Sequence, residues 1–154
     1  EEFIFSGYEF SKVLLETINK GASFRFRAKG FSMLPFVRNG DVLTISPLNG
    51  DLPSLGWIVA FINPLSANLV VHRIVSQGSN LYFLKGDSLF RADGFISKRN
   101  IIGKVNRIER NGRNVNFEHN IILQLLIVLL SRARIFSILL KILSGFRSLR
   151  EKLL

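Results

Sequence analysis

The spacing of hydrophobic residues in the first twenty positions is that of a helix. Phe10, Val13, Leu14 and Ile18 recur at steps of three and four, and a glycine follows the last of them. This spacing predicts a short amphipathic helix over residues 7–20. Its apolar side either packs on the rest of the same domain or contacts a membrane.

From Phe24 the period changes to two, which is typical of half-exposed strands. Phe24, Phe26 and Ala28 alternate with basic residues, and further strand-like runs follow, separated by Gly, Pro, Asn and Asp. Those runs are residues 41–46, 57–62, 69–76, 81–85 and 101–109. Asn111-Gly112 then predicts a tight hairpin turn. Short strands with frequent turns predict a mostly β domain, antiparallel and barrel-like, over residues 1–118.

Residues 119–154 have a different character and predict a C-terminal helical segment. Residues 121–130 are apolar apart from Gln124, a run too short by itself to cross a hydrocarbon layer of ~30 Å. Polar residues then recur in steps of three and four at Ser131, Arg134, Ser137, Lys141, Ser144 and Ser148. On one long helix they form a narrow polar stripe in an apolar surface. We expect this tail to lie along or dip into a bilayer, the alternative being that it buries its apolar surface against protein.

The charge distribution favours a membrane partner for this tail. The chain has 154 residues and a net charge of +10, and residues 119–154 hold six Lys and Arg against one Glu. A segment that is both basic and apolar predicts contact with an anionic membrane surface, through residues 121–150. Net charge and the Phe/Arg alternation near Phe24 are weak indications of nucleic-acid binding, so none is expected.

Composition also limits the chemistry. There is no cysteine, which excludes disulfides and thiolate metal sites, and the two histidines, His72 and His119, are far apart in sequence. We therefore expect neither a metal nor a cofactor.

Four residues in three separated segments are candidates for nucleophilic catalysis. A serine hydroxyl needs a neighbouring base, and that base works best when a third group orients it. Ser32, His72 and two aspartates, Asp87 and Asp93, occur in that order. Each has an ordinary structural reading as well: Ser32 and the aspartates suit turns, and His72 suits an apolar core.

Taken together, five short sequence boxes resemble the type I signal peptidase family, in particular its signalase-like branch. The matching boxes are Ser32-Met33-Leu34-Pro35, Gly40-Asp41, His72-Arg73, Lys85-Gly86-Asp87 followed six residues later by Asp93, and Ile102-Gly103-Lys104-Val105. The resemblance covers residues 24 to 108. Autoproteolytic repressors with a similar β core use a Ser-Lys pair, whereas this chain has His72 at the matching position.

The resemblance implies a Ser-His-Asp mechanism. By this match Ser32 is the nucleophile, His72 the general base and Asp93 the group that orients it, while Asp87 and Arg73 support the site. A histidine base predicts a rate that falls when acid protonates the imidazole.

The resemblance also indicates how the oxyanion and the substrate are bound. Many members have a second serine where this chain has Gly30, so oxyanion binding would fall to backbone N–H groups such as that of Ser32. Phe26, Ala28 and Met33 would line shallow pockets for small substrate residues; their alternative role is in the core.

The expected function is therefore a membrane-associated serine endopeptidase, peripheral or monotopic. It would cleave an extended segment of a peptide or preprotein after a small residue. The alternative is a non-catalytic, membrane-tethered β module that binds partners in a secretion or precursor-processing assembly.

Overall fold

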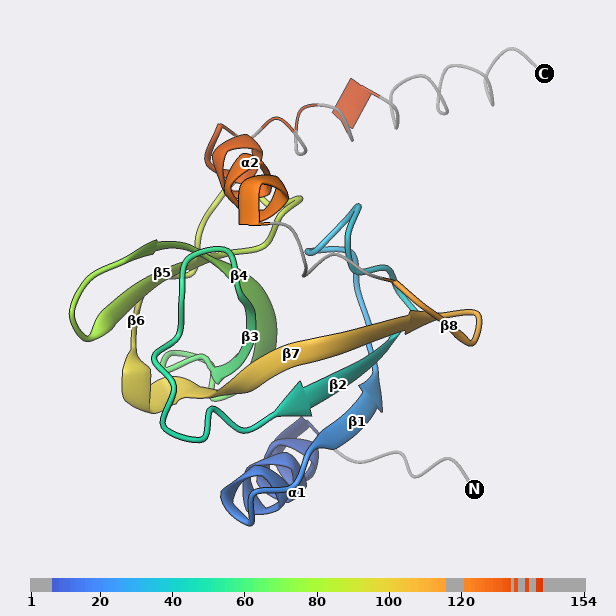
Figure 1. Cartoon of the computed structure of the whole chain (residues 1–154), viewed down its shortest axis with the longest axis vertical. Coiled ribbons are helices and arrows are strands. Elements are labelled where there is room, and N and C mark those ends of the chain that lie inside the picture. The colour runs from blue at the N-terminus through green and yellow to red at the C-terminus, as the bar shows by residue number, and fades with distance from the viewer. Residues whose placement is uncertain (1–6, 116–120, 134, 136–137, 139–140, 143–154) are drawn as a thin grey trace.

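Eight antiparallel strands form one sheet in the computed structural model, which describes residues 7–115, 121–133, 135, 138, 141 and 142 (Figure 1). The elements in chain order are α1 (Gly7–Asn19), β1 (Phe24–Arg27), β2 (Val42–Ser46), β3 (Ile58–Ile62), β4 (Leu69–Gln77), β5 (Leu81–Lys85), β6 (Gly94–Ser97), the 3-10 turn η1 (Lys98–Asn100), β7 (Ile101–Arg110), β8 (Arg113–Asn114) and α2 (Ile121–Arg132). The mostly β, antiparallel prediction is confirmed.

The sheet is strongly bent but does not close, so the barrel-like part of the prediction is wrong. The strand order is β1-β2-β7-β3-β4-β5-β6, with β8 paired to β7, which leaves β1 and β6 as the outer strands. Register shifts at Thr44/Ile45, Ala60/Phe61 and Ile74/Ser76 bend three strand pairs. Strand patterns in a sequence indicate which residues form strands, but they do not encode whether the first and last strands meet.

Helix α1 packs on the β1 side of the sheet through an aromatic cluster. The ring of Phe10 lies 5.5 Å from that of Phe24 and 5.3 Å from that of Phe26, both edge to face. Gly21 follows the helix with a φ of 78°, the left-handed conformation that suits a helix end. The predicted helix is thus confirmed to within a residue, and it packs on its own domain.

A second hydrophobic cluster lies between β3, β4, β5 and β6. Val59, Phe61, Ile74 and Leu84 are completely buried there. The short strand β6 was not predicted, because Asp93-Gly94 has the composition of a turn. At the other end of the sheet the predicted hairpin is present, since Asn111 and Gly112 both have positive φ, 51° and 74°.

Helix α2 packs against β4 and presents much of its apolar surface to solvent. Ile127, Val128 and Ser131 are buried, whereas Leu126 and Leu129 are exposed. In Figure 1, α1 and α2 lie at opposite ends of the molecule. Across the described residues, no helix has both the length and the apolar character that crossing a membrane requires.

The long helical tail predicted over residues 119–154 is supported only in part: α2 covers Ile121–Arg132, the described residues 135, 138, 141 and 142 are also helical, and the rest of the tail lies outside the described residues. Of the predicted stripe, Ser131 is fully buried and the Lys141 ammonium lies 4.3 Å from the centre of the Phe90 ring. These two polar residues therefore contact the protein. Arg134, Ser137, Ser144 and Ser148 lie outside the described residues.

Candidate functional site

Ser32 lies in the loop that follows β1. The β1–β2 pairing continues one step past the strand, because Ala28 N–H donates to the Asp41 carbonyl at 2.7 Å. Gly30, with a φ of 97°, then turns the chain, and its N–H donates to Asn39 Oδ1 at 3.1 Å. Ser32 follows two residues later and is half-buried. The rigid β1–β2 ladder thus leads directly into the candidate nucleophile.

His72 and Asp93 are in direct contact. His72 Nδ1 lies 2.5 Å from Asp93 Oδ2, although the two residues are 21 positions apart in sequence. His72 is on β4, and Asp93 precedes β6, where its N–H donates to the Leu84 carbonyl at 3.0 Å. A carboxylate on Nδ1 holds the imidazole in the tautomer that leaves Nε2 free to accept a proton.

Only 6 % of the His72 side chain is exposed, and its Nε2 atom has no hydrogen-bond partner among the described residues. Among the described residues, Ser131 Oγ is the one buried side-chain nitrogen or oxygen that lacks a hydrogen-bond partner. His72 Nε2 also lacks a partner but is not fully buried, so it keeps some contact with solvent. That is the state a general base requires.

Gly86 brings the serine loop and the histidine together. A Cβ atom at residue 86 would lie 2.6 Å from the Ser32 carbonyl oxygen and 2.9 Å from His72 Nε2. Those two atoms therefore lie within about 6 Å of each other, across a position that only glycine leaves open. This close approach explains why glycine occupies the centre of the Lys85-Gly86-Asp87 box.

Ser88, two residues after Gly86, holds the backbone of the serine loop with two hydrogen bonds. Its N–H donates to the Ser32 carbonyl at 3.0 Å, and its hydroxyl donates to the Phe31 carbonyl at 2.6 Å. Two consecutive carbonyl groups are thereby tied to one residue, which fixes the peptide that carries Ser32.

A buried ion pair fixes the next residues. Arg73 Nε and Nη2 donate to the two carboxylate oxygens of Asp87 at 2.9 and 2.8 Å, and Arg73 Nη1 donates to the Gly56 carbonyl at 2.9 Å. The guanidinium also lies 5.2 Å from the centre of the Phe36 ring, in the loop after Ser32. Arg73 thus joins β4 to both loops that meet at His72.

The hydrogen bond that a Ser-His nucleophile would need is not formed. Within the described part of the chain, no hydrogen bond joins Ser32 Oγ to His72. The N–H of Ser32 also has no partner there, so it is available to bind an oxyanion. Catalytic hydrogen bonds are often long or misaligned in the absence of substrate, so a missing bond does not by itself argue against a Ser-His pair.

The three candidate substrate-binding residues belong to the hydrophobic core on the α1 side. Met33 and Ala28 are buried, and Phe26 is partly buried against Phe10. Their packing in this cluster matches the alternative role in the core that the sequence also allows for them.

A second ion pair supports the turn before β2. Arg110 Nε and Nη2 donate to both oxygens of Asp41 at 2.9 and 2.8 Å. Burial alone would raise the pKa of the Asp41 carboxyl, but hydrogen bonds from Arg110 and the Arg38 N–H, with the charges of both arginines, outweigh burial and lower it. The same hydrogen bond raises the pKa of Arg110. The pair ties the end of β7 to the Gly40-Asp41 box.

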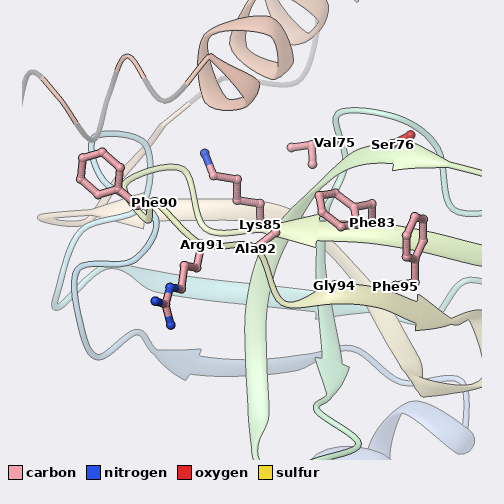
Figure 2. Close-up of a pocket in the computed structure, with 9 residues that line it drawn as sticks. All are labelled: Val75, Ser76, Phe83, Lys85, Phe90, Arg91, Ala92, Gly94 and Phe95. Atoms are coloured by element: carbon pink, nitrogen blue, oxygen red, sulfur yellow. The ribbon is translucent and has the colours of Figure 1, made fainter.

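A separate cavity of about 640 Å³ lies beside β5 and β6. Figure 2 shows Phe83 and Phe95 at one side of this cavity and Phe90 at the other, with Lys85 pointing towards α2. The Lys85 ammonium donates to the Ser131 carbonyl near the C-terminal end of α2. Neither Ser32 nor His72 lines this cavity, so it is distinct from the candidate site.

The sequence did not reveal how two residues contribute to this geometry. Gly86 was visible as part of a box, but its close approach to Ser32 and His72 was not. Ser88 is a residue type that is common in turns, so the sequence did not indicate its hydrogen bonds to the serine loop. In the described residues, no group of three or more His, Asp and Glu is placed to hold a metal ion.

In comparisons with known proteins, no family model matches the chain and no curated protein does.

Proposed function

We propose that this protein is a membrane-associated serine endopeptidase of signal-peptidase type. Its substrate would be an extended precursor segment with a small residue before the cleaved bond. The observation that carries this proposal is the meeting of three segments: Asp93 on His72 Nδ1, and the Ser32 loop facing His72 Nε2 across Gly86.

In the proposed first step, His72 Nε2 takes the proton of Ser32 as Oγ attacks the substrate carbonyl carbon. The carbonyl oxygen becomes an oxyanion, which the free N–H of Ser32 binds. The Asp93 carboxylate stabilises the imidazolium that forms. The imidazolium then protonates the leaving amine, the C–N bond breaks, and an acyl-enzyme remains.

The second step regenerates the enzyme. His72 removes a proton from water, the resulting hydroxide attacks the acyl carbon, and the ester bond to Ser32 Oγ breaks as the hydroxyl regains its proton. No cofactor is needed for either step. Gly30 contributes no side-chain donor to the oxyanion, and a typical donor supplies ~3 kcal/mol, so a modest rate is expected.

Membrane association is proposed through the C-terminal segment, residues 121–150. On the described part of that segment, Leu125, Leu126 and Leu129 are exposed while Ser131 is buried against the protein. An exposed row of leucines favours a lipid surface, and the basic residues of the segment favour an anionic one. A vesicle-binding assay comparing Leu126→Ser/Leu129→Ser with the parent chain tests this part.

Cleavage of precursor peptides, read by mass spectrometry, tests the catalytic proposal. We expect Ser32→Ala and His72→Ala to lose turnover, whereas Ser79→Ala, which changes an exposed serine in the β4–β5 turn, should keep the rate of the parent. Turnover that persists in Ser32→Ala would exclude Ser32 as the nucleophile.

The alternative function is a membrane-tethered binding module without catalysis. The missing hydrogen bond between Ser32 Oγ and His72 favours it. This alternative predicts that neither the parent chain nor Ser32→Ala cleaves any candidate precursor, while both bind it equally.

A further inference from the structure

The outer edge of β1 is free in the described structure and leads to the candidate nucleophile. β1 pairs with β2 on one side, and no described strand pairs with its other side. An extended peptide could add a strand there through main-chain hydrogen bonds, with alternate side chains on the two faces. Such a strand would run along β1 towards Ser32.

The two faces of β1 differ sharply in chemistry. Phe24 and Phe26 point towards the core, where Phe10 of α1 packs on them. Arg25 and Arg27 alternate with them and are exposed. Lys29 continues the basic series at the next alternate position, also exposed.

This basic row carries uncompensated charge. Arg25 pairs with Glu109, but Glu109 also pairs with Arg107 at 2.7 Å, so one carboxylate serves two arginines. Arg27 donates to the Gly40 carbonyl at 3.0 Å. Among the described residues, neither Arg27 nor Lys29 forms an ion pair with a carboxylate.

We propose, on the basis of the proposed function, that the substrate of this enzyme carries acidic side chains at alternate positions of the segment that pairs with β1. Side chains directly opposite each other on paired strands are close enough for opposite charges to attract and like charges to repel. Substrate residues that face Arg25, Arg27 and Lys29 are therefore acidic, and the residues between them are small or apolar.

The geometry favours a peptide over a membrane as the partner of this row. The charges repeat every second residue beside free backbone groups, which matches the register of a strand, whereas a lipid surface needs no register. The exposed leucines that suit a membrane are on α2, far from α1 and β1 in Figure 1.

Matched peptides with Glu, Gln or Lys at the alternate positions test the proposal on the full chain. We expect kcat/KM to be about tenfold higher for the Glu peptide than for the Lys peptide, and to approach equality at high salt. Arg27→Glu/Lys29→Glu should abolish or invert this preference. The control Lys98→Glu/Arg99→Glu changes the net charge equally on η1 and should keep it.

Binding of the same labelled peptides to Ser32→Ala, followed by fluorescence anisotropy, measures the preference without turnover. Equal binding of the Glu and Lys peptides would overturn the acidic-substrate proposal and leave the peptidase proposal standing. Preferential binding of the Glu peptide with no cleavage by the parent chain would refute the peptidase and retain the acidic partner. If Arg27→Glu/Lys29→Glu weakens binding to anionic vesicles but leaves peptide preference unchanged, the row serves a membrane and the proposal is wrong.

Discussion

Adding one methyl group at residue 86 is the most direct test of the geometry at the candidate site. In Gly86→Ala the new Cβ would lie 2.6 Å from the Ser32 carbonyl oxygen and 2.9 Å from His72 Nε2, whereas ordinary contacts begin at 3.4 Å. The first neighbour is backbone, and Ser88 also holds it by a hydrogen bond. The serine loop must therefore move by about 0.8 Å relative to the loop of residue 86.

The expected cost has two parts. Forcing an extra methyl group into a packed region typically destabilises a protein by ~1–3 kcal/mol. Alanine also lowers the conformational entropy of the unfolded chain relative to glycine, which offsets ~0.4–1 kcal/mol of that loss. We expect a net loss of about 1–2 kcal/mol in the free energy of unfolding, or a Tm lower by about 3–6 °C for a domain of this size. Because misplacement by about 1 Å at a reacting centre can cost ~100-fold, the proposed peptidase activity should fall by about tenfold to a hundredfold.

Gly78→Ala is the matched control. The Cβ that it adds lies 3.7 Å from its nearest neighbour, the Leu81 carbonyl oxygen, which is an ordinary contact. Its stability should stay the same or rise by up to ~1 kcal/mol, with unchanged activity. Chemical denaturation followed by circular dichroism measures stability, and peptide cleavage measures activity. If Gly86→Ala is as stable and active as Gly78→Ala, the close approach of the Ser32 loop to His72 is wrong.

Three further changes test the surrounding contacts. Asp87→Asn leaves the buried Arg73 without its counter-charge, and we expect ~3–5 kcal/mol of destabilisation in urea unfolding; a loss below ~1 kcal/mol would contradict the buried pair. The lowered pKa of Asp41 contributes stability that is present above 3.8, the usual aspartate value, and is lost as pH falls through the lower folded-state pKa. Unfolding free energy should therefore fall less steeply below about pH 4 in Asp41→Asn than in the parent, and equal slopes would refute the contribution of the pair with Arg110. Ser88→Ala removes one clamp on the serine loop and should lower kcat more than it raises KM, with partial rescue by Ser88→Thr; a change in KM alone would indicate a substrate contact instead.

Local patterns predicted most of the secondary structure because helix and strand spacing depend on residues that are near one another in the chain. The apolar steps from Phe10 to Ile18 gave α1, and turn-forming residues separated strands close to their observed bounds. β6 was missed because a four-residue strand that begins with glycine has too few positions to show a period. The predicted tail is described only in part, and α2 (Ile121–Arg132) is its first section.

The sequence by itself determined the mostly β class, α1, most of the strands and the residues that are candidates for catalysis. Tertiary structure alone decided that the sheet stays open at β1 and β6, that Asp93 reaches His72, and that Gly86 lets the Ser32 loop approach the imidazole. It also decided that Ser131 faces the protein while Leu125, Leu126 and Leu129 of α2 are exposed. Each of these outcomes depends on a distance between residues remote in the chain, and such distances are set by how the strands pair and bend, which no local pattern of residues encodes.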